Sequence, residues 1–308
     1  MDVRSKKLLA LVGGAGALAI TGGMAALGAQ LYRHPRETIN AVLHGGLLLA
    51  GVREGTVDVG IPMHYYTAGR SGGGGSPLVL IHGLGSSAES WSGLMLLLSK
   101  EFLVYAPDFP GFGKTPMAPE GVTIRTHVDY LRRFLDALGY LRVTLAGNSL
   151  GGWIAARFAA EYPERVDRLY LLNSAGLLRE STNPPYAVNR EQAKRVMQHI
   201  MGYRFPVPGF ILDSFIRNTQ LPAYKQFLEN YDPREELDNV LEQIKAPTMI
   251  VWGERDGIFP LTCAFDLHKG IPDSRLVLLP RAGHVTQVQA PLTVARIILR
   301  GNKRCDAH

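Results

Sequence analysis

The sequence predicts an α/β fold: a mostly parallel central sheet with helices on both faces and an inserted helical cap, preceded by an N-terminal transmembrane helix. Three observations predict it. From residue 78 onward, short apolar runs alternate with helical patterns, which is typical of a parallel sheet. The alternation stops over residues 177–245 and then resumes. Residues 8–32 carry no charged side chain.

The composition is that of a globular chain. Its 308 residues are 46% hydrophobic and 19% charged, which is enough for a sizeable core. The formal charge of +6 is spread along the chain without basic runs beside aromatic residues, which argues against a nucleic-acid partner. Cys263 and Cys305 are too few for a disulfide framework, and whether they pair stays open. No His/Cys cluster has the spacing of zinc ligands.

The first 32 residues predict a membrane anchor. The uncharged run 8–32 follows Arg4, Lys6 and Lys7, and as a helix it is long enough to cross a hydrocarbon core of about 30 Å. A signal peptide needs a shorter apolar core and a clean cleavage site, so we expect the anchor to be retained, although cleavage stays open. The basic residues before the run place the N-terminus in the cytoplasm and the remaining chain on the non-cytoplasmic side of the membrane.

The elements then follow in order. Residues 33–54 indicate an amphipathic connector, and 55–176 with 246–308 form the predicted core. A hairpin is expected first, with strands over 56–59 and 63–67. Buried strands are expected over 78–81, 102–106, 143–146, 169–173, 248–252 and 276–279. Helices are expected over 123–138, 153–160 and 261–269 and after 291. Residues 177–245 hold several prolines and short helical patterns, which indicate a helical cap.

A Gly-x-Ser-x-Gly pattern lies between an expected strand and an expected helix, with Gly147, Ser149 and Gly151 at its fixed positions. Such a turn holds the serine in a strained conformation that lifts its hydroxyl above the sheet edge. The backbone is so crowded there that only very small residues fit at the second position before the serine and the second position after it. The helix that follows aims its N–H groups and positive dipole end at the place where an oxyanion forms. The pattern therefore predicts a nucleophilic serine.

A serine nucleophile needs an adjacent base that is oriented by a third group. Asp256 and His284 each follow a later expected strand, in the chain order that the nucleophile-elbow plan requires. The ends of these strands face the same sheet edge as Ser149. A single loop His or Asp is weak evidence, because most are solvated or capping residues. Three such residues at three strand ends are stronger evidence for a catalytic site.

These motifs resemble the α/β-hydrolase family over roughly residues 55–300. They are His82-Gly83-Leu84-Gly85, Asp108-Phe109-Pro110-Gly111-Phe112-Gly113, Gly147-Asn148-Ser149-Leu150-Gly151-Gly152, Trp252-Gly253-Glu254-Arg255-Asp256 and Gly283-His284. The resemblance implies Ser149 as nucleophile, Asp256 as orienting acid and His284 as general base, with no metal or organic cofactor. It also implies an oxyanion hole made by the backbone N–H groups of Leu84 and Leu150.

Three other residues of these motifs could take part by their chemistry alone. Asp108 is a rival acid, but it precedes Ser149 in the chain, which is the wrong position for the triad. Glu254 is a second rival and lies too early in its turn. His82 is expected to stabilise its own loop.

The motifs are similar to two branches of the family. Asn148, before the serine, is similar to meta-cleavage C–C hydrolases, although Ser86-Ser87 and Val285 depart from that branch. Ser174-Ala175-Gly176-Leu177 and Tyr203-Arg204-Phe205-Pro206-Val207-Pro208 resemble the membrane-anchored monoacylglycerol lipase branch, which also carries one N-terminal anchor. Gln289 stands where the family usually has an acidic residue, and the sequence alone offers no interpretation of it.

We therefore expect an anchored serine hydrolase that cleaves carboxylic esters of small molecules, of the kind found in acylglycerols and other lipids. Phe210, Leu212 and Phe215 in the cap would suit an acyl chain, or would pack the cap onto the core. Two alternatives stay open: hydrolysis of a C–C bond in a ring-cleavage dienoate, and a non-catalytic binding protein with a hydrolase-like fold.

Overall fold

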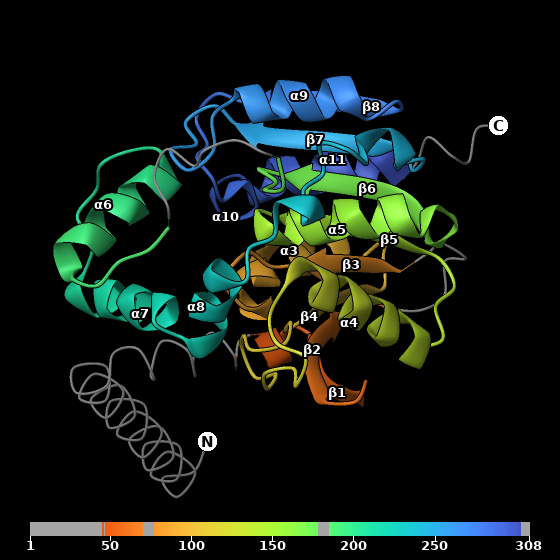
Figure 1. The fold of residues 1–308 in the computed structure, drawn as a ribbon, viewed down its shortest axis with the longest axis horizontal. Helices are drawn as coiled ribbons and strands as arrows, with labels where there is room; N and C mark the ends of the chain where they lie inside the picture. Colours follow the sequence, from red (N-terminus) through yellow and green to blue (C-terminus); the bar gives the residue numbers. More distant parts are fainter. Residues whose placement is uncertain (1–44, 46, 70–76, 178–184, 303–308) are drawn as a thin grey trace, which may run out of the picture. The chain divides into compact units, whose positions relative to one another are not determined.

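The computed structural model describes residues 45, 47–69, 77–177 and 185–302 (Figure 1). The predicted anchor, most of the connector and Cys305 lie outside these residues. Among the helices that are described, none is both long and apolar enough to cross a membrane.

One eight-stranded sheet forms the centre of the described chain, in the order β1-β2-β4-β3-β5-β6-β7-β8. The first two strands form an antiparallel hairpin, and β2 pairs antiparallel with β4. All other pairs are parallel. The strands are β1 (Arg53–Asp58), β2 (Pro62–Ala68), β3 (Leu78–Ile81), β4 (Val104–Pro107), β5 (Val143–Asn148), β6 (Val166–Leu172), β7 (Thr248–Gly253) and β8 (Ser274–Leu279). The predicted mostly parallel sheet is therefore confirmed.

Helices cover both faces of the sheet (Figure 1). On one face lie α4 and α5, while α3 packs against α11 on the other. The core helices are α3 (Ser92–Leu98), α4 (Ile124–Ala137), α5 (Leu150–Glu161), α9 (Thr262–Gly270), α10 (Thr286–Gln289) and α11 (Pro291–Asn302). The single-turn 3₁₀ helices are η1 (Ala88–Trp91), η2 (Pro163–Arg165), η3 (Pro233–Glu235) and η4 (Leu241–Gln243).

The described part of the segment for which the sequence predicts a cap, residues 177 and 185–245, holds three α-helices: α6 (Arg190–Met201), α7 (Gly209–Thr219) and α8 (Pro222–Glu229). Figure 1 shows them grouped beside the sheet. Asn189 begins α6 by accepting a hydrogen bond from Gln192 N, and Gly202 ends it in the left-handed conformation (φ 74°). A small hydrophobic cluster of Ala187, Ala193 and Leu212 lies among these helices, apart from the main core.

The fourth strand begins two residues later than the sequence predicts. Phe102, the first residue of the predicted strand, donates its N–H to Leu98 O (3.0 Å) and so belongs to the turn that ends α3. The helix α3 itself is not predicted from the sequence, because its last five residues, 94–98, are an unbroken apolar run without helical periodicity.

A histidine lies fully buried in the main core. His127, on α4, packs edge-on against Phe109 and stacks on Phe112. Burial, and to a smaller extent the neighbouring His82, lower the pKa of His127 to about 4. The ring is therefore neutral in the folded protein over most of the physiological pH range.

This buried ring predicts a loss of stability in mild acid. Since the native pKa is about 4 and the ordinary value is 6.5, the unfolded chain binds the proton first as the pH falls below 6.5. We expect His127 to cost up to about 1.4 kcal/mol of unfolding free energy per pH unit between these values. Urea unfolding of the wild type and His127→Phe at pH 7, 6 and 5 measures the slope. Equal slopes in the two proteins would contradict the prediction.

Candidate active site

Ser149 occupies a sharp turn between β5 and α5. Its backbone has φ 56° and ψ −121°, a conformation that side-chain-bearing residues rarely adopt. Hydrogen bonds hold the turn on both sides. Ser149 N donates to Leu172 O (3.1 Å), and Ser149 O accepts from the N–H groups of Gly152 (2.9 Å) and Ala175 (3.0 Å). A non-glycine residue kept in a strained conformation by its surroundings is typical of a functional site.

The two glycines of the pattern are there because the turn leaves no room for a side chain. A Cβ atom at Gly147 would lie 2.1 Å from Gly151 O. A Cβ atom at Gly151 would lie 2.1 Å from Ile81 O, in the neighbouring strand β3. Both obstacles are backbone atoms, so no side-chain movement relieves them. The structure thus gives the physical reason for the predicted small residues.

The structure brings His284 and Asp256 together. His284 lies between β8 and α10, Asp256 lies between β7 and α9, and His284 Nδ1 is 2.8 Å from Asp256 Oδ2. The side chains are 8% and 1% exposed, so the bond is shielded from water. Because the carboxylate accepts at Nδ1, the Nε2 lone pair of His284 is the one available to accept a proton.

The carboxylate of Asp256 is held by donors on both oxygens. Oδ1 accepts from the backbone N–H groups of Ile258 (2.8 Å) and Phe259 (3.2 Å). Oδ2 accepts from His284 and also from Asn173 Nδ2 (2.7 Å). This set of four donors fixes the orientation of the carboxylate towards His284.

Sequence reasoning did not find Asn173. It follows β6 and has φ 44°, in the left-handed region that asparagine tolerates better than most residues. Its amide oxygen accepts from Gly253 N (3.3 Å) while its nitrogen donates to Asp256. The only available sequence signal is an asparagine directly after a buried strand, which by itself is equally typical of an ordinary turn.

The serine and the base are tied together through Asn148. Its Nδ2 donates to the backbone oxygens of His284 (2.9 Å) and Leu172 (2.9 Å), and its Oδ1 accepts from Gln287 Nε2 (3.0 Å). Within the described chain, no hydrogen bond joins the Ser149 hydroxyl to the ring of His284. Bonds between nucleophile and base often shorten to hydrogen-bond length only when substrate binds.

The loop after β3 lies against the serine. A Cβ atom at Gly83 would be 3.4 Å from the Cβ of Ser149. The next residue, Leu84, and Leu150 at the start of α5 are the two whose N–H groups are expected to form the oxyanion hole. Neither group donates to another described residue. Their contact with a ligand oxygen stays a prediction.

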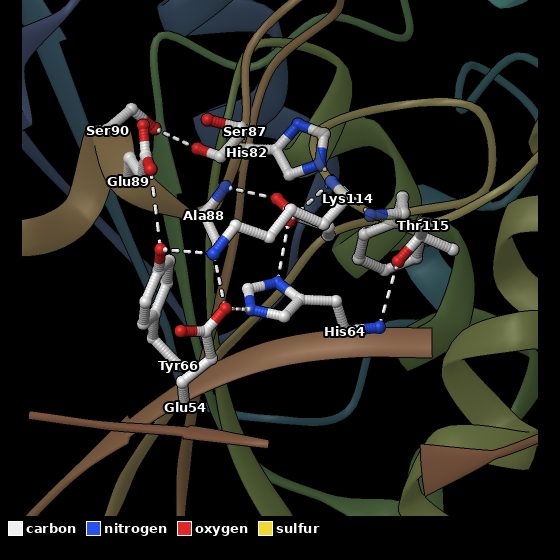
Figure 2. Close-up of polar contacts among 12 residues, drawn as sticks. Glu54, His64, Tyr66, His82, Ser87, Ala88, Glu89, Ser90, Lys114 and Thr115 are labelled. Carbon is white, nitrogen blue, oxygen red and sulfur yellow. Dashed lines mark hydrogen bonds and ion pairs between the residues drawn. The ribbon is translucent and has the colours of Figure 1, made fainter. Parts of the chain in front are cut away.

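Asp108, the rival acid, is occupied elsewhere: it contacts His64, Ala88 and Lys114, and Figure 2 labels these three partners. Its Oδ1 accepts from Ala88 N (2.7 Å), and its Oδ2 accepts from Lys114 N (3.0 Å) and contacts His64 Nδ1 (2.8 Å). The other ring nitrogen of His64 lies 2.7 Å from Glu54 Oε1, which also forms an ion pair with the Lys114 ammonium. Asp108 therefore joins β2, the loop after β4 and the start of η1, and it does not contact His284.

The charge state of Asp108 fits this structural role. Burial by itself would raise the pKa of the carboxyl group. The hydrogen bond with His64, the nearby His82 and the N–H groups of Ala88 and Lys114 act in the opposite direction and lower the pKa below its ordinary value. Asp108 is accordingly a buried carboxylate whose charge is satisfied by its own loop.

Two further residues of the predicted motifs have their own places. His82 accepts from Phe109 N at Nε2 (3.1 Å) and contacts Gly83 O through Nδ1 (2.9 Å), so it braces the loop after β3. Burial lowers the pKa of His82. Glu254 is exposed at the end of β7, and His284 pairs with Asp256 instead.

The cap residues named from the sequence lie on α7. Leu212 is buried in the cap cluster, and Phe215 packs partly against that cluster. Phe210 is half-buried. Contact of these residues with a substrate stays a prediction. Within the described residues, no group of His, Cys, Asp and Glu side chains has the arrangement of a metal site.

Comparison with known proteins gives the family. A family model described as alpha/beta hydrolase fold matches residues 76–217. The 2-hydroxy-6-oxo-2,4-heptadienoate hydrolase of Pseudomonas putida is 30% identical over 245 residues, which are 73% of this chain and 88% of that protein. The chain belongs to the α/β-hydrolase family.

Further relatives of this α/β hydrolase include lipases. A monoacylglycerol lipase of Mus musculus is 28% identical over 249 residues, covering 72% of this chain and 74% of the lipase. The crystal structure of a membrane phospholipase A covers 100% of both chains with a TM-score of 0.77 and 24% identity, which supports the fold. The resemblance predicted from the motifs is thus confirmed, and hydrolase activity follows from the family.

Proposed function

We propose that this α/β hydrolase cleaves carboxylic esters, and that its substrates are acylglycerols or other lipid esters. The observation that carries the proposal is the buried hydrogen bond between His284 and Asp256, in the loops that follow β8 and β7 of the parallel sheet in which β5 leads to Ser149. A nucleophile, an oriented base and two available N–H donors are the parts that acyl transfer requires.

In the proposed mechanism, Ser149 Oγ attacks the ester carbonyl carbon while His284 Nε2 takes its proton. The N–H groups of Leu84 and Leu150 stabilise the negative oxygen of the tetrahedral intermediate. His284 then gives the proton to the leaving alcohol, which leaves an acyl group on Ser149. Water, deprotonated by the same ring, attacks the acyl group and releases the carboxylic acid. Asp256 holds His284 in the tautomer that these steps need.

The preference for lipids has separate support. The monoacylglycerol lipase among the relatives acts on a lipid ester, as its name states. Phe210, Leu212 and Phe215 put apolar side chains on the cap helix α7. We further propose that residues 1–32 anchor the chain in a membrane, with the catalytic part on the non-cytoplasmic side, because the run 8–32 is uncharged.

Hydrolysis of a C–C bond is the second candidate, favoured by the relative that acts on a dienoate. Asn148 no longer supports it. Both ends of the Asn148 amide are used by Leu172, His284 and Gln287, and the side chain is buried. Asn148 therefore has a structural role that would be the same in an esterase and in a C–C hydrolase, and it does not discriminate between their substrates.

A substrate comparison tests the proposal. The full chain in detergent is assayed with p-nitrophenyl esters of increasing length, with a dispersed monoacylglycerol, and with 2-hydroxy-6-oxo-2,4-heptadienoate, whose absorbance bleaches on cleavage. We expect kcat/KM for the best ester to exceed that for the dienoate by at least about 100-fold. The opposite order would establish the C–C hydrolase. Failure of a fluorophosphonate probe to label the chain would support a non-catalytic protein.

The same preparation tests the anchor. We expect the full chain to remain with cell membranes after washing with alkaline carbonate, which releases peripheral proteins. Release of the chain into the wash would contradict the proposed membrane anchor. It would not affect the conclusion on ester hydrolysis, which the substrate comparison tests separately.

A further inference from the structure

The C-terminus of cap helix α6 sits directly on the two loops that carry the proposed acid and base. The last carbonyl groups of a helix have no partner within the helix and must find donors elsewhere. His199 O accepts from Gly257 N (3.1 Å), next to Asp256. Ile200 O accepts from the backbone N–H of His284 itself (2.7 Å). A Cβ atom at Gly283 would lie 2.4 Å from Ile200 O, so the contact is close.

Gln289 supplies the third donor. Its Nε2 donates to Met201 O (2.8 Å), and its Oε1 accepts from Gly283 N (2.9 Å), the residue before His284. The two partners fix which end of the amide is which, because a backbone oxygen can only accept and a backbone N–H can only donate. One side chain therefore bridges the cap helix and the loop of the proposed base.

A carboxylate could not make this bridge. An ionised acid in place of Gln289 would accept hydrogen bonds only. It could accept from Gly283 N, but it would face Met201 O with a second negative oxygen. The amide performs both functions at once, which gives a physical reason for glutamine in this chain.

We propose that Gln289 is a positioning residue that fastens α6 to the His284 loop, so that docking of the cap holds the proposed base in its working orientation. The inference rests on the proposed function of His284. It links cap helix α6 to the residue proposed to take the proton, and it needs no contact between Gln289 and substrate.

The decisive variant is Gln289→Glu, which keeps the size of the side chain, removes the donor and, when ionised, adds a negative charge. At pH 8 we expect kcat to fall about 10-fold with KM changed less than 2-fold, since one hydrogen bond becomes a repulsive contact. As the pH falls, the new carboxyl group takes up a proton and regains a donor. The ratio of wild-type to variant kcat is therefore expected to shrink towards 1 in acid. A merely destabilised protein would show no such recovery.

Two control variants separate the effect of the added charge from the effect of losing the hydrogen bonds of Gln289. Gln243→Glu makes the same change of charge on an exposed side chain of η4 and is expected to leave kcat unchanged at every pH. Gln289→Met has similar length, removes both hydrogen bonds and adds no charge. It is expected to lower kcat by a similar factor at all pH values. These profiles are measured with the ester that the wild type cleaves best.

Hydrogen exchange gives a readout that does not depend on the reaction. The amide proton of His284 is expected to exchange at least about 10-fold faster in Gln289→Glu than in the wild type at pH 8, because its bond to Ile200 O opens more often. Unchanged exchange together with unchanged kcat would overturn the inference and leave the proposed function intact. A wild type without hydrolytic activity would refute the proposed function, while faster exchange would still establish the bridge.

Discussion

Replacing Ser149 by alanine is expected to lower kcat for ester hydrolysis by about 10⁴-fold or more, because the step that forms the acyl-enzyme loses its nucleophile. The fold is expected to remain. The Ser149 side chain makes no hydrogen bond to another described residue, and alanine keeps the Cβ atom that the turn already accommodates. The unfolding free energy of Ser149→Ala should thus stay within about 1 kcal/mol of the wild type.

A glycine at the same position separates function from strain. Ser149→Gly removes the Cβ atom at φ 56°, where a side chain costs of order 1–3 kcal/mol. We expect this variant to be as inactive as Ser149→Ala and more stable than the wild type. Thermal unfolding and ester hydrolysis are measured on the same preparations, with Ser99→Ala at the C-cap of α3 as a control that stays active. Residual activity within 10-fold of the wild type in both variants would contradict the assignment of the nucleophile.

Much of the fold could be predicted from the sequence because the signals are local. Each buried strand is a short apolar run, and α4 shows apolar residues at helical spacing with Thr123 as its N-cap. The prediction failed where that signal is missing. The apolar run of α3 has no periodicity, and α10 has only four residues, too few for a periodic pattern.

The residues of the candidate site also differ in whether a local sequence signal indicates them. Ser149, Asp256 and His284 could be proposed from the sequence because their order in the chain and their positions after expected strands can be read from it directly. Asn173 was missed because its role depends on φ 44° and on a partner 83 residues away. Gln289 had no interpretation because its partner Met201 lies in the cap, and no local pattern indicates where α6 ends against the core.

The choice between Asp256 and Asp108 as the orienting acid gives the second large effect. In Asp256→Asn, the amide oxygen is expected to face the N–H groups of Ile258 and Phe259, which can only donate. The amide NH₂ then points at His284 Nδ1. The ring must accept there and carry its proton on Nε2, so it cannot take the proton of Ser149. We expect kcat to fall about 10⁴-fold.

Asp108→Asn is the matched variant, because it makes the same chemical change in a carboxylate that is 2% exposed and has three hydrogen-bond partners, where Asp256 has four. It weakens the bonds that join β2 to the start of η1, so we expect the unfolding free energy to fall by about 2–4 kcal/mol. We expect kcat to change less than about 10-fold, since Asp108 does not contact His284. Urea unfolding and steady-state hydrolysis of both variants give the comparison. If Asp108→Asn abolished activity in a folded protein while Asp256→Asn stayed active, the orienting acid would have to be reassigned to Asp108, and the bond between Asp256 and His284 would be structural.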